Sequence, residues 1–544
     1  MLTNFKPSSR MKSTSKYLAM AVVALWAAVC FVFFQWFYLY HLVYRLQQQL
    51  FLYSGDYISS YFHHPAWLAC LSGDFITQFF YFNFGGSLTI TVSLLLLGVV
   101  CYVALGRFKL NSPKQSRGIG MWIKMLLSLA LITWEALRNC GIDYELSSTI
   151  SLIGGILLFL PCVRYQRWLP GVFLLPLCYW LFGYGVWAFL LLAVVYEITL
   201  RRYIIAPLLV IVALIIPTVI RQQYHLTWKQ AYQYPANSFF NKPNFTHEKL
   251  LTMAVESSFG HWNKVALLSE KEDLHLNIST YFYNLSHAMQ GRLPDQLMNE
   301  YQPGPLGLLI PLGPDTPLLS LWCSNEVWFQ LGDMTMAEHA TLLGMIFSPN
   351  HRSSSMVMRL AEINMINGDT QASMKYLRML QKTWLYKGWA EQRMPGKEDI
   401  KVQGWLKRKR ALLPVQDSLR AVNDHTLSLR ALLNNHPDNT MALDYLLCYD
   451  LLTKDMAAFM TDYDMYKKIG AEVPNRLYSE ALLIGLMKRQ ATIEDVKRYR
   501  IMPDVLQNFN EYTSLYEKNK GDGTALQLQY RKTYWFYYHF ATFK

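Results

Sequence analysis

The feature that most constrains this sequence is a series of long apolar tracts in its first 220 residues. Each tract is close to the roughly 20 residues that a helix needs to cross a bilayer. The seven tracts are residues 17–40, 88–105, 121–136, 149–163, 169–182, 184–200 and 203–220. No small-x-small cleavage site follows the first tract, which is therefore interpreted as a retained span rather than a signal peptide. The sequence predicts a polytopic membrane helix bundle of about seven spans over residues 1–220.

Basic residues in the short loops predict the orientation of this bundle. One set of loops holds Lys6, Arg10, Lys12, Lys16, Arg107, Lys109, Lys114, Arg117, Arg164, Arg167, Arg201 and Arg202. The opposite set holds only Arg45, Arg138 and Arg221 near its ends. Loops rich in Lys and Arg stay in the cytoplasm. We expect a multi-pass inner-membrane protein with a cytoplasmic N-terminus and a periplasmic C-terminal domain.

The rest of the chain has the pattern of paired helices. Residues 221–247 are predicted to be a linker, and residues 248–544 an extracytoplasmic domain of helical hairpins. Two Gly-Asp turns, at Gly332 and Gly368, lie 36 residues apart, and a third turn at Lys454-Asp455 lacks the glycine. These units resemble tetratricopeptide repeats, whose period is about 34 residues. The predicted fold class is all-α, and the resemblance implies a curved surface suited to partners.

Composition limits the possible functions. The first 220 residues hold 15 Lys+Arg and 6 Asp+Glu, and the remainder holds 36 and 32, so most of the +13 net charge flanks membrane segments. This distribution argues against a nucleic-acid partner. The sequence has no phosphate-binding Gly loop, no Gly-x-Ser-x-Gly and no His-Glu-x-x-His, so no cofactor or metal is predicted. Cys323 and Cys448 either pair in one disulfide or, as we favour, remain free buried thiols.

The loop between the first two spans, residues 41–87, holds two candidate functional acids. It is too polar to span a bilayer and rich in aromatic rings, which suit the lipid–water boundary. Short interfacial helices on the outer face are therefore expected. Asp56 and Asp74 each follow a Ser-Gly pair, which favours a turn or cap role over chemistry.

A third candidate acid, Glu135, lies near the outer end of the third span. An acid within a membrane segment is a functional candidate by default. The alternative is an ion pair with Arg138 three residues later, and Glu197 is interpreted in the same way as the partner of Arg201. Asp143 and Glu145, in the next outer loop, are interpreted as solvated residues.

Three further segments have simple interpretations. The Pro/Gly-rich residues 303–317 are expected to form a loop that docks on the membrane or on the helical array. The basic run 407–410 is expected to be a solvated helix face or a phospholipid contact. The aromatic residues 533–540 are expected to form a final helix that caps the array, with a membrane or carbohydrate contact as the alternative.

Two resemblances bear on function. Residues 49–52, 75–81 and 533–538 together with the array look like a family of multi-span membrane proteins of Bacteroidota, which implies a location but no activity. The overall arrangement is also similar to membrane glycosyltransferases that use polyprenyl-phosphate sugars. That similarity implies a first-loop carboxylate, Asp56 or Asp74, as general base or ligand of a divalent metal, with Glu135 as a possible third acid.

Two functions follow as hypotheses. In the leading one, the protein is held in the lipid bilayer and its periplasmic helical array binds a protein or an envelope polymer in a scaffold or assembly role. In the alternative, it is an enzyme that transfers a sugar from a polyprenyl-phosphate donor. The two differ in whether the candidate carboxylates converge in a polar cavity at the outer membrane face.

Overall fold

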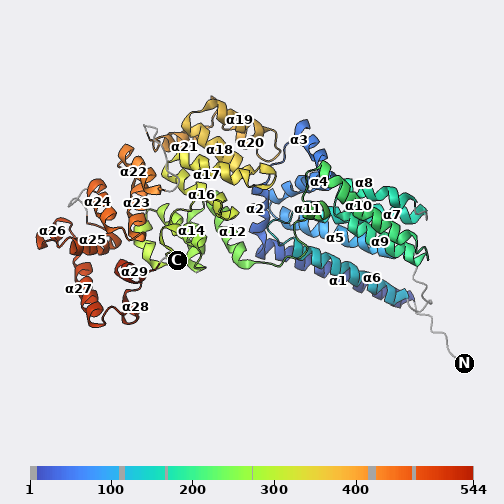
Figure 1. The fold of residues 1–544 in the computed structure, drawn as a ribbon, viewed down its shortest axis with the longest axis horizontal. Helices are drawn as coiled ribbons and strands as arrows, with labels where there is room; N and C mark the ends of the chain where they lie inside the picture. The colour runs from blue at the N-terminus through green and yellow to red at the C-terminus, as the bar shows by residue number, and fades with distance from the viewer. Residues whose placement is uncertain are drawn as a thin grey trace. The chain divides into compact units, whose positions relative to one another are not determined.

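The structure is a computed structural model that describes residues 9–108, 117–165, 169–272, 274–414, 424–467 and 473–542. These residues form α-helices with short 3-10 turns and one π-helical turn, and they contain no β-strand (Figure 1). The chain divides into two compact units. Unit 1 comprises Met1–Glu248 and Gln381–Lys387, and unit 2 comprises Lys249–Leu380 and Gly388–Lys544. The predicted all-α fold class is confirmed.

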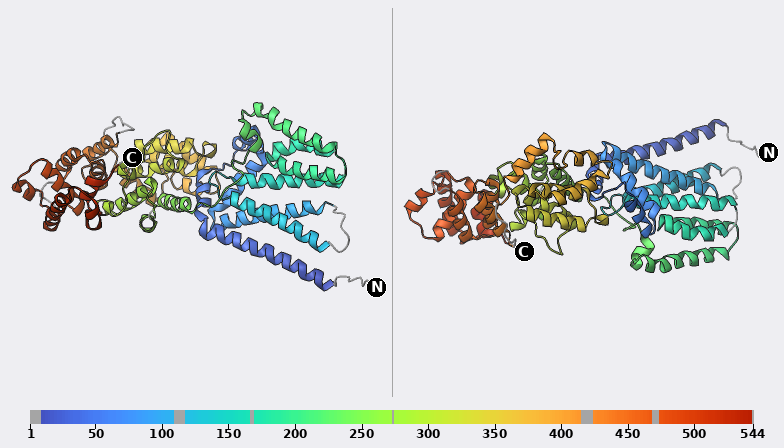
Figure 2. Two further views of the ribbon diagram at one scale, coloured as in Figure 1. Left: turned by 60° about the horizontal axis from the view of Figure 1, so that its bottom comes forward. Right: turned by 90° about the horizontal axis from the view of Figure 1, so that it is seen from above.

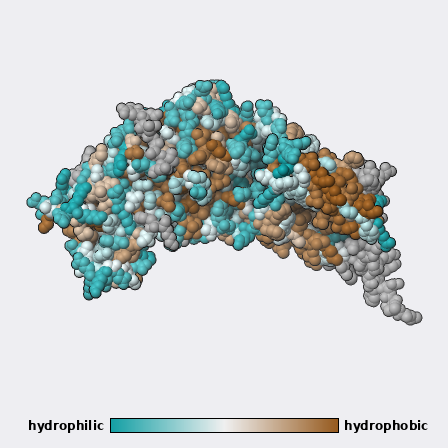
Figure 3. Space-filling view, in the orientation of Figure 1, coloured by the Kyte–Doolittle hydropathy of each residue, from teal (hydrophilic) through white to brown (hydrophobic). Residues whose placement is uncertain are grey.

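Unit 1 contains five helical stretches that are long and apolar enough to cross a membrane. The long helices are α1 (Ser9–Val32), α5 (Gly85–Gly106), α6 (Arg117–Arg138), α7 (Leu146–Tyr165) and α10 (Ile205–Gln223). The five stretches are Lys16–Phe37, Gly85–Gly106, Gly120–Arg138, Leu146–Val163 and Ile205–Gln223. They run side by side (Figure 2), and apolar residues cover much of the face seen over this unit (Figure 3).

Two further apolar helices of unit 1 are shorter. They are α8 (Leu169–Phe182), with 14 residues, and α9 (Gly185–Thr199), with 15 residues. At a rise of about 1.5 Å per residue they extend roughly 21–23 Å, less than the ~30 Å hydrocarbon core of a bilayer. That these two helices each cross the bilayer therefore stays a prediction. Of the basic residues used for the orientation, Lys6, Lys109, Lys114 and Arg167 lie outside the described residues.

Glycines allow the helices of unit 1 to approach closely. A Cβ added to Gly155 of α7 would lie 2.0 Å from the carbonyl oxygen of Gly185 at the start of α9. A Cβ added to Gly185 would lie equally close to the carbonyl oxygen of Ser151. Small residues at such crossings are typical of helices that pack in membranes, where close van der Waals contact drives association.

Short helices fill the segment between the first two long helices. They are α2 (Leu39–Gln48), α3 (Gly55–Ser60) and α4 (Trp67–Thr77), with 3-10 turns at Tyr61–His63 and Gln78–Tyr81. A π-helical turn, Phe33–Phe37, precedes α2. Glu248, distant in sequence, accepts hydrogen bonds from the backbone N–H groups of Tyr40 and His41, so it caps the otherwise unsatisfied N-terminus of α2.

The predicted linker, residues 221–247, packs within unit 1. It contains the end of α10, α11 (Trp228–Gln233) and the start of α12 (Phe245–Ser258). The Tyr184 N–H donates to the carbonyl oxygen of Tyr234 at 2.9 Å, and the indole of Trp187 donates to that of Tyr232. These contacts hold the segment against the loop between α8 and α9.

Unit 2 is a helical-repeat-like array. Three of its helix pairs are α16 (Leu318–Leu331) with α17 (Met334–Ile346), α18 (Ser354–Asn367) with α19 (Thr370–Gln381), and α23 (Thr440–Leu452) with α24 (Met456–Tyr466). The other helices of this region include α13 (Trp262–Lys271), α14 (Asn277–Ala288), α15 (Leu293–Gln296), α20 (Lys387–Glu391), α21 (Ile400–Arg410), α22 (His425–Asn435), α25 (Arg476–Lys488), α26 (Ile493–Arg498), α27 (Pro503–Lys518), α28 (Thr524–Tyr530) and α29 (Tyr534–Phe540).

The three pairs turn by the same chemistry. Gly332, Gly368 and Lys454 each adopt positive φ, at 99°, 79° and 61°. The aspartate that follows each of them caps the second helix, accepting from the N–H three residues on. A left-handed residue ends one helix and an Asp N-cap begins the next, so the Gly-Asp and Lys-Asp dipeptides define the hairpins.

The three segments singled out in the sequence all pack within unit 2. In the Pro/Gly-rich loop, Leu308 and Leu309 are buried and Asn284 donates to the carbonyl oxygen of Gly307, so the loop docks on the array. Helix α29 is a packed cap, as predicted, with Trp535 fully buried.

The basic run is not simply a solvated face. Lys409 donates to the carbonyl oxygen of Phe329 at 3.0 Å, and Arg410 donates to that of Met365 at 2.7 Å. The two cations therefore satisfy carbonyl groups near the ends of α16 and α18, where the helix dipole favours positive charge. All eight cysteines, including Cys323 and Cys448, are free and buried.

Candidate functional site

Glu135 lies at the centre of a buried ion-pair cluster. Its side chain is fully buried in α6, where one carboxylate oxygen accepts from an Arg138 Nη at 3.0 Å. The other oxygen accepts from the hydroxyl groups of Tyr144 and Thr149, at 2.7 and 2.6 Å. The carboxylate thus has a cation and two hydroxyl donors, which is the arrangement that a buried charge requires.

Aromatic rings and a carbonyl group complete the surroundings of Arg138. Its guanidinium carbon lies 4.4 Å from the ring centroid of Trp134 and 4.5 Å from that of Tyr144, within cation–π range. It also donates to the carbonyl oxygen of Ser238, at 3.0 and 3.2 Å. The ion-pair interpretation of Glu135 is therefore confirmed. Glu197 also forms an ion pair, but with Arg202 at 3.6 Å rather than with the predicted Arg201.

Asp74 has a different environment. It belongs to α4 and is only 8 % exposed. The hydroxyl of Tyr61 donates to one carboxylate oxygen at 2.5 Å, and the hydroxyl groups of Tyr61 and Tyr57 lie 2.7 Å apart. Asp74 is thus the inner end of a short chain of hydroxyl groups that begins in α3.

A second acid interacts with Asp74. Burial raises the pKa of Asp74, and the charge of Glu145 raises it further, against the hydrogen bond from Tyr61, so that it reaches about 7. Burial also raises the pKa of Glu145, which lies just before α7 and accepts from Ser147 at 3.1 Å. Glu145 is only partly exposed, because α4 packs on α7 beside it, so the interpretation as a solvated loop residue fits the exposed Asp143 but only part of the surroundings of Glu145.

Arg45 of α2 supplies positive charge to the same region. Its charge lowers the pKa of Glu145 against the effect of burial. Both Nη atoms of Arg45 are buried and have no hydrogen-bond partner among the described residues. The same is true of both side-chain polar atoms of Gln48 in the same helix. The region around Asp74 is therefore less completely satisfied than the cluster around Glu135.

The Ser-Gly pair before Asp74 does not form a turn, contrary to our interpretation of the sequence. Residues 72–74 lie inside α4. A Cβ added to Gly73 would lie 2.6 Å from the backbone nitrogen of Ser147. Gly73 is required because α4 and α7 touch at this point, and the same contact places Asp74 near Glu145.

Asp56 is exposed in the first turn of α3, preceded by the N-cap residue Ser54. An acid in this position interacts favourably with the positive end of the helix dipole. Among the described residues, no hydrogen bond or ion pair joins Asp56, Asp74 and Glu135 to one another. The three acids singled out in the sequence thus have three different surroundings, and only Asp74 combines burial with a neighbouring acid.

Chemically, the Asp74 region can hold or release a proton near neutral pH. A general base works best when its pKa lies near the working pH, and a buried acid beside a second acid meets this condition. Because Asp74 is only 8 % exposed, a substrate reaches it only if the surrounding short helices move. The hydroxyl groups of Tyr61 and Tyr57, which link Asp74 to α3, are buried as well.

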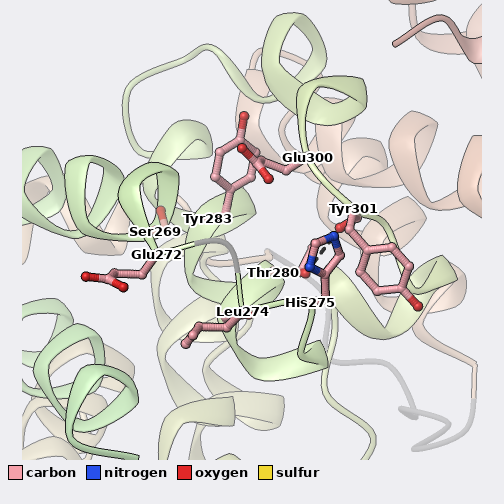
Figure 4. Close-up of a pocket in the computed structure, with 9 residues that line it drawn as sticks. Ser269, Glu272, Leu274, His275, Thr280, Tyr283, Glu300 and Tyr301 are labelled. Atoms are coloured by element: carbon pink, nitrogen blue, oxygen red, sulfur yellow. Dashed lines mark hydrogen bonds between the residues drawn. The ribbon is translucent and has the colours of Figure 1, made fainter. Parts of the chain in front are cut away.

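A small pocket in unit 2 lies between α13, α14 and the segment after α15 (Figure 4). Tyr283 and Glu300 point toward each other, and His275 lies beside Tyr301 with ring centroids 5.2 Å apart. The pocket offers about 10 Å³, which is room for about one water molecule. It is therefore too small in this conformation for an organic ligand.

The described residues contain no group of three or more His, Cys, Asp or Glu side chains placed to hold a metal ion. A family of unknown function, DUF6057, matches residues 14–541. The chain belongs to this family. The DUF6057 match runs through both units, so membrane-type helices and helical pairs are parts of one family architecture. Neither a curated protein nor a solved structure matches the chain.

Sequence reasoning missed Glu145, Arg45 and Tyr61 as neighbours of Asp74. Glu145 is 71 residues away from Asp74 in the chain, and only the packing of α4 on α7 brings them near each other. Two signals were present. Tyr57 and Tyr61 have helical spacing, and Gly73 stands in the middle of an apolar segment, where a glycine often marks close helix contact.

Proposed function

We propose that this DUF6057 member is an integral inner-membrane protein whose helical array lies in the periplasm and binds a protein or an envelope polymer. The observation that carries the proposal is the union, in one chain, of five membrane-length helices with an array of capped helix pairs. Such arrays present extended surfaces, and their usual work is binding rather than catalysis.

The count of spans supports the placement of the array. Five helices are long enough to cross, and α8 and α9 form a hairpin of two shorter apolar helices. If this hairpin crosses the bilayer, the chain has seven spans. If the hairpin stays within one leaflet, the chain has five spans. Both numbers are odd, so a cytoplasmic N-terminus puts unit 2 outside the cytoplasm in either case.

The array is tetratricopeptide-like in its turn chemistry. Each of the three clear pairs uses a residue with positive φ followed by an Asp cap, and the two Gly-Asp turns are 36 residues apart. The packed cap α29 closes one end of the array, as a terminal element of a solenoid must. The array thus has the parts of a stable scaffold.

The test uses the full-length protein in its own membrane. Photo-reactive amino acids are placed at exposed positions of the array, for example at Lys401 in α21, and matched substitutions are placed at Arg107 on the expected cytoplasmic side. The proposal predicts discrete crosslinked species from the array positions, made of periplasmic protein or envelope polymer. Crosslinks only from position 107, or only to cytoplasmic proteins, would contradict it.

A second function is favoured by one observation, the environment of Asp74. A buried acid with a pKa near 7 beside Glu145 and the Tyr61–Tyr57 hydroxyl groups is suited to take a proton from an incoming sugar hydroxyl. This candidate function is transfer of a sugar from a polyprenyl-phosphate donor at the outer membrane face. Of the three candidate acids, only Asp74 supports this function.

The two functions are separated by Asp74→Asn, with Asp56→Asn as the matched control. The transferase predicts an altered envelope glycan profile for Asp74→Asn at unchanged protein level, and no change for Asp56→Asn. An unchanged profile for both variants would reject the transferase and leave the binding function in place.

A further inference from the structure

An open aromatic groove lies on unit 1, and Asp74 is not among the residues that line it. It has a volume of about 670 Å³ and is lined by Tyr53, Phe75, Phe79, Gln381, Lys382, Thr383 and Trp384. This volume is within the range of about 300–1,000 Å³ that is usual for ligand sites. All of the lining residues belong to unit 1, because the segment Gln381–Lys387 packs there.

The aromatic side chains of the groove are unusually exposed. Trp384 is 51 % exposed and Phe75 is 41 % exposed. Their rings meet edge to face: Phe79 and Trp384 at 69°, and Phe75 and Phe79 at 79°. Edge-to-face rings form a ribbed apolar wall rather than the flat platform on which a sugar ring stacks.

The groove lies directly before a membrane-length helix. Phe82 packs on Trp384 at 5.5 Å between ring centroids, and its carbonyl oxygen accepts from the N–H of Gly85, the first residue of α5. Phe84, in the same turn, stacks on Phe31 of the first candidate span. An aromatic surface where a span begins is placed at the boundary between lipid and water.

One wall of the groove is cationic and polar. The exposed Lys382 lies there with Gln381 and Thr383. The backbone of this wall is fixed, because the Tyr53 N–H donates to the Lys382 carbonyl oxygen at 2.7 Å. The groove thus places an apolar wall, which suits a hydrocarbon chain, beside a positive charge at the boundary of the bilayer.

We propose that this groove binds one membrane lipid with an anionic phosphate headgroup, its chain against Phe75, Phe79 and Trp384 and its phosphate beside Lys382. A lysine at the membrane surface attracts lipids with anionic headgroups. This lipid site is independent of the array's partner and of any proton chemistry at Asp74. A soluble glycan is the competing occupant that the experiment must exclude.

The experiment uses the full-length protein in phosphatidylcholine vesicles that contain a few per cent of a lipid with brominated chains, which quench nearby tryptophan. The contribution of Trp384 is the difference between the wild type and Trp384→Phe. The proposal predicts that brominated phosphatidylglycerol quenches this contribution several-fold more than brominated phosphatidylcholine does at the same fraction. Lys382→Gln abolishes the preference, and Lys401→Gln, on α21, leaves it unchanged.

A second measurement does not depend on variants. A photo-reactive phosphatidylglycerol in the same vesicles should label the peptides that contain Phe75 and Trp384 in the wild-type protein. Equal quenching by the two lipids, no quenching of Trp384, or labelling elsewhere would overturn the proposal. Displacement of the lipid by a soluble oligosaccharide would also overturn it, because the groove would then be a glycan site.

Discussion

Glu135 and Asp74 are two buried acids of unit 1 with opposite surroundings. Glu135 has a cation, Arg138, and two hydroxyl donors on its carboxylate. Asp74 has one hydroxyl donor, Tyr61, and its pKa is raised by burial and by the charge of a second acid, Glu145. The first set of partners fixes a charge in place, and the second makes the charge unfavourable.

The difference teaches that burial alone does not identify a functional acid. Within a chain that spans a membrane, Glu135 looked like the less ordinary residue, because a membrane-embedded acid is expensive. Because its partners satisfy its carboxylate, Glu135 is given a structural role. Asp74, in a short helix between spans, keeps the freedom to exchange a proton because burial and the charge of Glu145 oppose its own charge.

The largest expected effect is that of Glu135→Ala. Removal of the carboxylate leaves the guanidinium of Arg138 buried without its anion, and breaking a buried pair in this way costs about 3–5 kcal/mol. We expect a much lower unfolding temperature of unit 1 in detergent. The unfolding temperature should fall less in the double variant Glu135→Leu/Arg138→Met than in Glu135→Ala. An equal or larger fall would contradict the ion-pair account.

The second effect concerns the contact that brings Asp74 to Glu145. Gly73→Ala places a Cβ 2.6 Å from the Ser147 backbone, so α4 and α7 must separate. Overpacking of this kind typically costs about 1–3 kcal/mol. Gly55→Ala is the matched control, because no atom lies within 4 Å of its added Cβ. Equal unfolding temperatures for the two variants would show that the close contact is not needed.

The third effect is a pH dependence at Asp74. Its pKa is raised from 3.8 to about 7, so the folded protein holds this proton more tightly than the unfolded chain does. The stability it contributes is complete below about pH 4 and is lost as the pH rises through about 7. Asp74→Asn removes this loss, so we expect the stability of the variant relative to the wild type to rise between about pH 4 and about pH 7.

The measurement is the unfolding temperature of the wild type, Asp74→Asn and Asp56→Asn across this pH range. At the acidic end Asp74→Asn should differ from the wild type by no more than a single hydrogen bond, about 1 kcal/mol. Asp56 is exposed, so Asp56→Asn should follow the wild type. Parallel curves for all three proteins would reject the raised pKa of Asp74.

The last effect repeats the pH test in unit 2. Burial and the neighbouring Asp462 raise the pKa of Asp450 to about 8, against the charge of Arg430. Asp450→Asn should therefore stabilise unit 2 as the pH rises toward about 8, by the same sign argument. The gain should extend over a wider pH range than for Asp74→Asn, because the pKa of Asp450 is raised further above its ordinary value. The unfolding of unit 2 in the wild type and in Asp450→Asn, followed at two pH values, tests this prediction.

Much of the fold was predictable, because it depends on local sequence. The apolar tracts predicted α5, α6, α7 and α10, and the Gly-Asp dipeptides predicted the hairpins of α16–α19. The ion pair of Glu135 was also visible, because its partner is three residues away on the same helix. These features need no knowledge of tertiary packing.

The site at Asp74 and the groove depend on contacts between distant segments and were not predictable. The Ser-Gly-Asp pattern is the same at positions 54–56 and 72–74, yet it begins a helix at the first position and lies inside one at the second. Nothing local distinguishes a turn glycine from a helix-contact glycine. Likewise, the sequence gives no sign that Gln381–Lys387, between two helices of the array, belongs to unit 1.

The central claim is that the helical array lies outside the cytoplasm, and a pair of reporters tests it most directly. An enzyme active only in the periplasm and a protein fluorescent only in the cytoplasm are each fused after Lys544 of the full chain, and after Gly106 as the cytoplasmic control. The account predicts enzyme activity without fluorescence at Lys544 and the reverse at Gly106. Fluorescence without enzyme activity at Lys544 would contradict the odd number of spans and, with it, the periplasmic array.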